Sequence, residues 1–326
     1  MKPFDNVETK ASLKRRIITA AAMVMILLPI FFLGDWFFFI ACGIVMGLAC
    51  FEVVHCIQKN SKPIVYVAAI TFVLLITFWP LLFTAVNHKV SSIHAYDYYL
   101  DYYISVFIIA FVVIVFGLIA ITDKTYKFRD VAELVFFIIF IGLAGQALIF
   151  IRFIPSLSAI STSKPANLKY FNTYDSFVSL KLFIYVLLGA ILTDIGGYFF
   201  GSSFGKHKLC PRISPKKTVE GFVGGVFLSF FITFFAALIF ANSGMPILEG
   251  VFDSEHWYLI LICSLLMPLL ATLGDLFFSM IKREHEIKDF SNLLPGHGGI
   301  LDRIDSISFS FIFVAILVRF MILPLI

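Results

Sequence analysis

Residues 279–305 read SMIKREHEIKDFSNLLPGHGGILDRID and form the most polar run of a 326-residue chain that is 60% hydrophobic. Apolar segments lead into this run and out of it. Its central stretch, residues 295–299, contains Pro and three Gly, which is too flexible a composition for a helix. We therefore expect a polar loop that carries chemistry, placed between two membrane helices.

The overall composition indicates an integral membrane protein. Only 14% of the residues are charged, whereas a soluble domain has about 25%. The 40 phenylalanines are expected to be mainly lipid-facing bulk. The cysteines are odd in number, at 5, and form no CxxC pair, so neither a disulfide framework nor a zinc site is indicated.

Nine apolar windows are long enough to cross about 30 Å of hydrocarbon as helices. They are residues 17–33, 36–57, 63–86, 102–122, 131–153, 180–200, 219–241, 257–281 and 306–325. We expect an all-α, polytopic membrane protein in which residues 1–179 hold five spans and an external connector, 154–179. Residues 180–326 would form a catalytic region of four spans with loops 201–218 and 282–305. The first window is expected to be an uncleaved span, because no small-x-small cleavage site follows it.

Lysine and arginine predict the orientation of these spans. If the N-terminus is cytoplasmic, the cytoplasmic segments hold 19 Lys and Arg and the opposite loops hold 3. Cytoplasmic loops of membrane proteins carry such an excess of positive charge. Both polar loops of the C-terminal half would then face the cytoplasm.

A second polar cluster, residues 194–220, reads DIGGYFFGSSFGKHKLCPRISPKKTVE. Ordinary positive-inside charge accounts for some of its five bases. It does not account for Ser214–Thr218 standing just before a helix, where backbone N–H groups favour phosphate. Further along, Gly221, Gly224 and Gly225 predict a close approach between two helices.

Acidic residues inside apolar spans are costly and tend to be functional. Asp275 lies near the end of one span, with Ser279 and Lys282 one and two turns further along the same face. The alternative is a packing pair between Asp275 and Lys282. Asp194 repeats this situation in another span, and Glu52 is a weaker case that could serve helix–helix hydrogen bonding.

Asp302 is expected in the loop before the last span, where it could face the same point as Asp275. Two carboxylates with space between them suit Mg²⁺, which prefers oxygen ligands and substrate phosphates. The alternative role of Asp302 is a helix N-cap, and Asp305 could equally cap. His297 would stabilise the glycine-rich turn or contact phosphate.

The polar runs resemble the signature of the phosphatidate cytidylyltransferases, over roughly residues 190–310. The signature residues are Ser279, Ile281, Lys282, Arg283, Lys288, Asp289, Ser291, Leu294, Pro295, His297, Gly298, Gly299, Ile300, Asp302, Arg303, Ile304 and Asp305. Ser214–Thr218 followed by Glu220 and Gly221 resembles a second family segment. Gly197 and Val219 depart from its usual residues, and neither would carry the chemistry.

The resemblance implies a membrane nucleotidyltransferase that makes CDP-diacylglycerol and pyrophosphate from CTP and phosphatidic acid. It implies Mg²⁺ on Asp275 and Asp302, and leaves room for a second cation such as K⁺ and for a homodimer. The chemistry would fall to Asp275, Asp302, Lys282, Arg283, Lys288, Asp289, His297 and Arg303. Substrate would be bound by Asp194, Arg212, Ser214, Lys216, Lys217, Thr218, Gly298, Gly299 and Asp305. The selection of CTP rests on the resemblance alone.

The expected setting is the cell (inner) membrane, with the active site on the cytoplasmic side and no nucleic-acid partner. Two other functions stay open. One is a CTP-dependent polyprenol- or phytol-type lipid kinase, which would release CDP instead of pyrophosphate. The other is a secondary transporter, which buried acids and membrane glycines also fit.

Overall fold

The computed structural model describes residues 35–59, 61–87, 96–153, 176–248 and 251–322, together with scattered positions between 18 and 32. In this part of the chain, helices account for nearly all regular structure. They are α2 (Asp35–Ile57), α3 (Pro63–Asn87), α4 (Tyr96–Thr122), α5 (Phe128–Phe153), α7 (Ser176–Phe204), α8 (Val219–Asn242), α9 (Trp257–Glu284) and α10 (Leu301–Ile322). Two short strands, β1 (Lys208–Cys210) and β2 (Ser214–Thr218), complete the set.

The all-α, polytopic membrane class is confirmed. Within the described residues, seven helices are long and apolar enough to cross a membrane, and α3 adds a shorter apolar segment, Pro63–Trp79. The predicted first span, 17–33, lies largely outside the described residues, as does most of the connector 154–179. A total of nine spans therefore stays a prediction.

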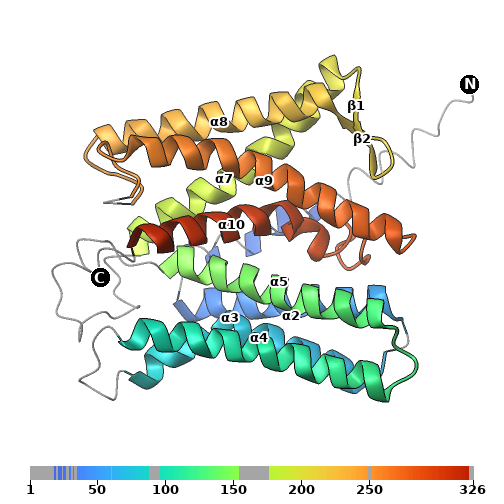
Figure 1. Ribbon diagram of the computed structural model, residues 1–326. Coiled ribbons are helices and arrows are strands. Elements are labelled where there is room, and N and C mark those ends of the chain that lie inside the picture. The colour runs from blue at the N-terminus through green and yellow to red at the C-terminus, as the bar shows by residue number, and fades with distance from the viewer. Residues whose placement is uncertain are drawn as a thin grey trace, which may run out of the picture.

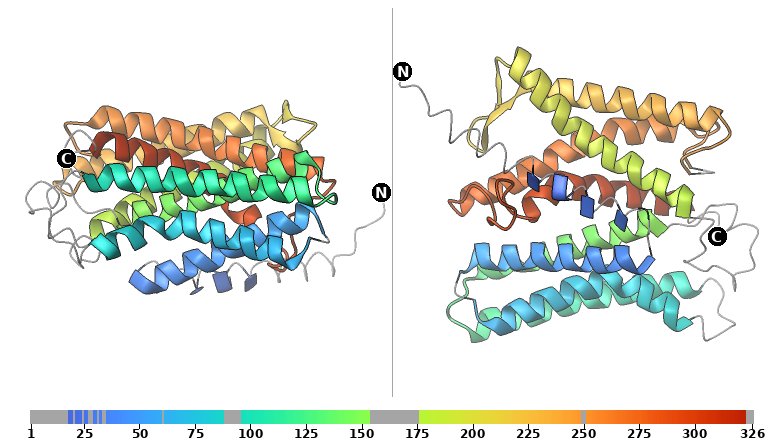
Figure 2. Two further views of the ribbon diagram at one scale, coloured as in Figure 1. Left: turned by 60° about the horizontal axis from the view of Figure 1, so that its bottom comes forward. Right: turned by 180° about the vertical axis from the view of Figure 1, so that it is seen from behind.

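The helices run side by side along one direction, so that their connections gather at two ends (Figures 1 and 2). The helices α2, α3 and α4 pack with α5, whereas α7, α8, α9 and α10 pack with one another. Because α5 also contacts α7 and α10, it joins the two groups. A continuous core of buried apolar side chains extends through both groups.

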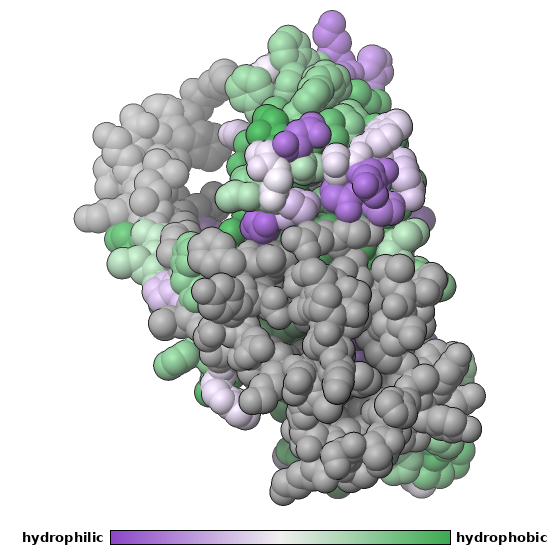
Figure 3. All heavy atoms as spheres, turned by 90° about the vertical axis from the view of Figure 1, so that its left-hand side faces the viewer, coloured by the Kyte–Doolittle hydropathy of each residue, from purple (hydrophilic) through white to green (hydrophobic). Residues whose placement is uncertain are grey.

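Polar contacts tie together the connections at the end that carries the β-hairpin, on the right in Figure 1. Lys62 pairs with Asp123 at 2.7 Å, and Arg129 pairs with Glu284 at 2.6 Å. The predicted grouping of these connections on one side is therefore present. Where the opposite end is coloured in Figure 3, hydrophilic residues form patches beside hydrophobic ones.

Small residues bring α7 and α8 together, as predicted. Gly221, Gly224 and Gly225 are buried on one face of α8, and a Cβ on Gly225 would lie 2.6 Å from the Thr193 carbonyl oxygen of α7. Such close backbone approach is typical of membrane helix pairs with small residues at the contact. This packing brings the start of α8, and with it β2, beside the end of α7.

One expectation about the polar loops was wrong, and the structure adds a detail to another. The last helix begins at Leu301 and not near 306, so Asp302, Arg303 and Asp305 lie in its first turns. Asp302 is thus a helical residue, and Asp305 lies too far inside α10 to cap it. The loop 201–218 is partly ordered as an antiparallel hairpin, in which Lys208 pairs with Thr218 and Cys210 with Ser214.

Candidate active site

Four acids from three helices converge at the hairpin end of the bundle. Asp194 comes from α7, Asp275 from α9, and Asp302 and Asp305 from α10. Gly274 allows α9 and α10 to approach closely here, because a Cβ at this position would lie 2.6 Å from the Asp305 carbonyl oxygen. The structure thus brings the predicted acidic residues into one region.

Asp275 is bound by side chains from two elements. Lys217 of β2 places Nζ 2.5 Å from Oδ2, and Ser279 donates its hydroxyl to Oδ1 at 3.2 Å. The side chains of Lys217 and Asp275 are each 26% exposed, so the pair stays accessible from solvent. The proposed packing pair between Asp275 and Lys282 is wrong, since the lysine that binds Asp275 comes from the hairpin.

Asp302 is buried and makes three contacts. Its Oδ1 lies 2.7 Å from Lys282 Nζ, and its Oδ2 accepts the backbone N–H groups of Phe290 at 2.9 Å and Gly299 at 3.0 Å. Lys282 also lies over the Phe290 ring, 5.6 Å from its centroid. Asp302 therefore binds a lysine and the backbone of residues 285–300, the segment between α9 and α10 that we call the catalytic loop. These contacts go beyond the N-cap alternative.

Asp305 is buried and accepts the backbone N–H of Ser306 at 2.7 Å. Asp194 accepts the Ser306 hydroxyl at 3.4 Å. Both carboxylates are close enough to Asp275 for their charges to repel, while Lys217 and Arg303 act favourably on Asp194, and Lys282 on Asp305. The region thus combines several acids with a few bases at the edge of the apolar bundle.

The remaining predicted residues surround this cluster. Arg283 donates to the backbone carbonyls of Ile213 at 3.3 Å and Ile287 at 3.0 Å, so it ties the hairpin to the catalytic loop. Thr218 caps α8 by accepting the Gly221 N–H at 3.1 Å. Ser214 lies on β2 and is half-buried, whereas the following residues are exposed: Arg212, Lys216, Lys288, Asp289 and Arg303.

The glycine-rich segment forms a tight turn. The Leu294 N–H donates to the Gly298 carbonyl at 2.9 Å, and Gly298 has a positive φ of 82°, which favours glycine. Among the residues that the structure describes, the buried Nδ1 atom of His297 has no hydrogen-bond partner. The Nδ1 atom therefore does not stabilise the turn through a hydrogen bond to a described residue. Contact between His297 and phosphate stays a prediction.

Glu52 is the residue whose contribution the sequence signalled only weakly. From α2 it binds Ser291 and the backbone at the start of α10. The available signal was a carboxylate in the otherwise apolar segment Ala49–Val54. The sequence did not reveal that its partners lie in the catalytic loop.

The carboxylates offer a donor set that suits Mg²⁺. An ionised carboxylate has about four lone-pair sites, so Asp275 with two protein contacts and Asp302 with three keep some capacity. No group of three or more His, Cys, Asp and Glu side chains in the described ranges is arranged to hold a metal ion. Mg²⁺ commonly takes one or two protein carboxylates and completes its shell with water and substrate phosphates.

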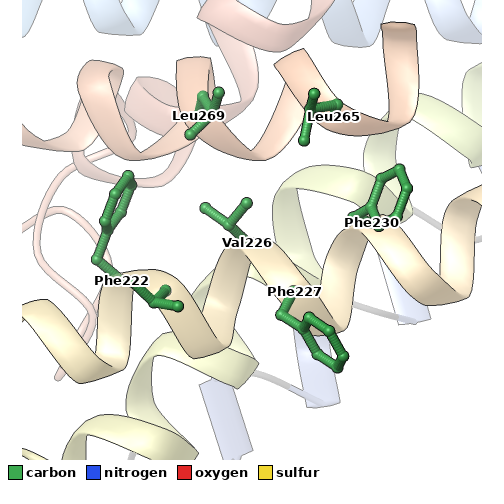
Figure 4. Close-up of a pocket in the computed structure, with 7 residues that line it drawn as sticks. Phe222, Val226, Phe227, Phe230, Leu265 and Leu269 are labelled. Atoms are coloured by element: carbon green, nitrogen blue, oxygen red, sulfur yellow. The ribbon is translucent and has the colours of Figure 1, made fainter. Parts of the chain in front are cut away.

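An apolar pocket of about 230 Å³ lies between α8 and α9 (Figure 4). It is lined by Phe222, Val223, Val226, Phe227, Phe230, Leu265 and Leu269. No charged side chain lines it, so it does not suit a nucleotide or a metal ion. Its walls suit hydrocarbon.

Fold and site together define a polytopic membrane protein with an acid- and lysine-rich polar site at one end. The cytidylyltransferase family model matches residues 14–321, and the chain belongs to this family. The predicted resemblance is therefore confirmed at the level of the family.

Relatives named phosphatidate cytidylyltransferase match part of the chain. The protein from Staphylococcus aureus (strain COL) is 45% identical over 130 residues, covering 40% of this chain and 46% of the relative. The protein from Bacillus subtilis (strain 168) is 46% identical over 117 residues, covering 36% of this chain and 39% of the relative. These matches span less than half of each relative.

Proposed function

We propose that the protein transfers the cytidylyl group of CTP to phosphatidate, forming CDP-diacylglycerol and pyrophosphate. The observation that carries this proposal is the convergence of Asp275, Asp302, Lys217 and Lys282 at one polar end of a membrane helix bundle. Family membership and the names of the relatives support it. A water-soluble nucleotide and a membrane lipid can meet only at such an edge.

In the proposed reaction, a phosphate oxygen of the lipid attacks the α-phosphorus of CTP. The bond from that phosphorus to the bridging oxygen of the β-phosphate breaks, and pyrophosphate leaves. Phosphoryl-type displacements depend on positioning and charge neutralisation more than on covalent help. Lys217 and Arg303, which lie near Asp275 and Asp194, would neutralise phosphate charge, and the hairpin bases Arg212 and Lys216 would attract it.

Asp275 and Asp302 would hold Mg²⁺, which supplies charge stabilisation on phosphate oxygens when bound. Lys282 supports this arrangement by fixing the Asp302 side chain at 2.7 Å, and Ser279 orients Asp275. Asp194 and Asp305 add two further carboxyl groups nearby. A second cation such as K⁺ and a homodimer stay predictions.

The acyl chains of phosphatidate would remain in the hydrocarbon region beside the polar site. The apolar pocket between α8 and α9 suits these chains because its lining is hydrophobic. Two of its lining residues are close in sequence to the polar site, since Phe222 follows Lys217 by five residues and Leu269 precedes Asp275 by six. On α9, six residues span about 9 Å. The pocket would then begin near the site and extend along the spans into the hydrocarbon region.

We place the site on the cytoplasmic side of the cell membrane, on the basis of the 19-to-3 distribution of Lys and Arg. Single cysteines introduced at 201–218 and 282–305 of a cysteine-free variant should resist an impermeant thiol reagent in intact cells. They should react once the cells are opened. Labelling from outside would overturn the orientation.

The proposed function is tested by product analysis with purified protein in detergent, phosphatidate, Mg²⁺ and CTP labelled at the α-phosphorus. The expected products are labelled CDP-diacylglycerol and unlabelled pyrophosphate. Release of labelled CDP on addition of a polyprenol would instead favour the lipid kinase. Family membership does not favour the kinase or the transporter.

A further inference from the structure

A buried carboxylate outside the proposed catalytic set contacts the catalytic loop. Glu52 lies near the end of α2, on the hairpin side of the bundle, and is only 3% exposed. A charged group in such surroundings is costly unless several hydrogen bonds compensate for its lost hydration. Its partners therefore indicate what the chain uses it for.

Three hydrogen-bond partners of Glu52 lie between residue 291 and the first residue of α10, Leu301. Its Oε1 accepts the Ser291 hydroxyl at 2.6 Å and the Ile300 N–H at 2.9 Å. Its Oε2 accepts the Leu301 N–H at 2.9 Å. One carboxylate from a distant helix thus caps the start of α10 and also binds Ser291, which precedes the glycine-rich turn.

The opposite side of the same turn is held by Asp302, which accepts the N–H groups of Phe290 and Gly299. Gly299 lies between the two acids, and a Cβ there would come within 2.6 Å of Glu52 Oε2. A larger residue at 299 would therefore displace the Glu52 carboxylate. The contacts of Glu52 and Asp302 therefore fix the glycine-rich turn and the start of α10 relative to each other.

We propose that Glu52 is a positioning residue for the reaction proposed above, and this inference rests on that function. It fixes residues 291–301, and through them the placement of Asp302 and Arg303, without contacting substrate itself. Through this side chain, α2 contributes to the arrangement of the site. Outer residues that orient catalytic groups commonly affect activity by about 10- to 100-fold.

The test compares Glu52→Gln with the matched control Glu133→Gln. Glu133 is a helix carboxylate at the same end that binds the side chains of Arg129 and His285 but no backbone of residues 291–301. In Glu52→Gln, an amide N–H₂ group replaces one carboxylate oxygen and cannot accept a hydrogen bond from a backbone N–H. One of the contacts to Ile300 or Leu301 is therefore lost. We expect kcat to fall about 10- to 100-fold with a smaller change in KM for CTP. The control should keep near-normal kcat.

Amide hydrogen exchange without substrate provides a readout that is independent of activity. Exchange at residues 298–303 should accelerate in Glu52→Gln and stay unchanged in Glu133→Gln. If the wild-type protein does not transfer the cytidylyl group, the proposed function is wrong. The hydrogen-exchange measurement would still show whether Glu52 holds the turn. Unchanged exchange together with normal kcat would overturn the inference.

Ser291→Ala keeps the inference testable if Glu52→Gln folds poorly, because it removes only the hydroxyl contact. We expect a smaller loss of kcat in Ser291→Ala alone. Added to Glu52→Ala, which removes the carboxylate that accepts the Ser291 hydroxyl, it should have little further effect, since that contact is already absent. Full additivity of the two effects would contradict the role assigned to Glu52.

Discussion

Two lysine–aspartate pairs at the same end of the bundle have the same N···O distance and opposite surroundings. Lys282 and Asp302 lie 2.7 Å apart with side chains 9% and 2% exposed. Lys62 and Asp123 also lie 2.7 Å apart, with side chains 64% and 15% exposed. Charge interactions strengthen as water is removed, and so does the cost of leaving one partner alone. Burial, and not distance, should therefore decide which pair matters.

The largest combined effect is expected from Asp302→Asn. It leaves Lys282 buried without a counter-charge, which typically costs about 3–5 kcal/mol, and it also weakens the hold on Phe290 and Gly299. The measurement is unfolding in detergent together with turnover. The double variant Lys282→Met/Asp302→Asn should recover part of the stability and none of the turnover. If Asp302→Asn is as stable as wild type, the buried pair does not have the role described.

Lys217→Ala should have an intermediate effect that falls on activity. A hydrogen bond to a charged group contributes about 1.5–3 kcal/mol, so turnover at limiting CTP should fall roughly 10- to 100-fold. The unfolding temperature should change little, because the side chain is partly exposed. Lys124→Ala, at an exposed lysine of the same end, is the control. Equal turnover in Lys217→Ala and Lys124→Ala would mean that the hairpin lysines contribute only to membrane orientation and not to the reaction.

Asp123→Asn should have the smallest effect, with turnover and unfolding temperature close to wild type. The hydrogen bond from Lys62, aided by Thr125, lowers the pKa of Asp123 to about 2. A carboxyl whose pKa falls on folding stabilises the fold above its unfolded pKa, and this contribution disappears as the pH drops towards 2. Wild type and Asp123→Asn should thus have the same pH dependence of unfolding between pH 5 and 8. A large difference there would mean that the exposed pair matters as much as the buried one.

Hydrophobic windows predicted most of the helices, because a bilayer demands long apolar segments whatever their neighbours. They missed the start of α10, which lies at Leu301 instead of 306. Asp302, Arg303 and Asp305 were expected in a loop, yet they are helical, and Glu52 caps their helix from 249 positions away. Such a contact between distant helices leaves no local pattern.

The sequence indicated which residues could form the candidate site, but not which of their side chains pair with one another. Asp275 with Ser279 follows from helical spacing, and the structure contains that hydrogen bond. The pairs of Lys217 with Asp275 and Lys282 with Asp302 join separate elements, and spacing could not predict them. These contacts also decide which variant tests catalysis most directly. Asp302 accepts two backbone N–H groups, so its replacement also disturbs the fold, whereas the contacts of Asp275 are with side chains.

Asp275→Asn is therefore the most direct test of the claim that the acid cluster is a catalytic site. The measurement is turnover against Mg²⁺ concentration for wild type, Asp275→Asn and Asp123→Asn, with unfolding followed alongside. We predict a well-folded Asp275→Asn protein whose turnover falls by about 10³-fold or more, while Asp123→Asn follows wild type at every Mg²⁺ concentration. A folded Asp275→Asn protein with near-normal turnover and normal Mg²⁺ dependence would contradict the account.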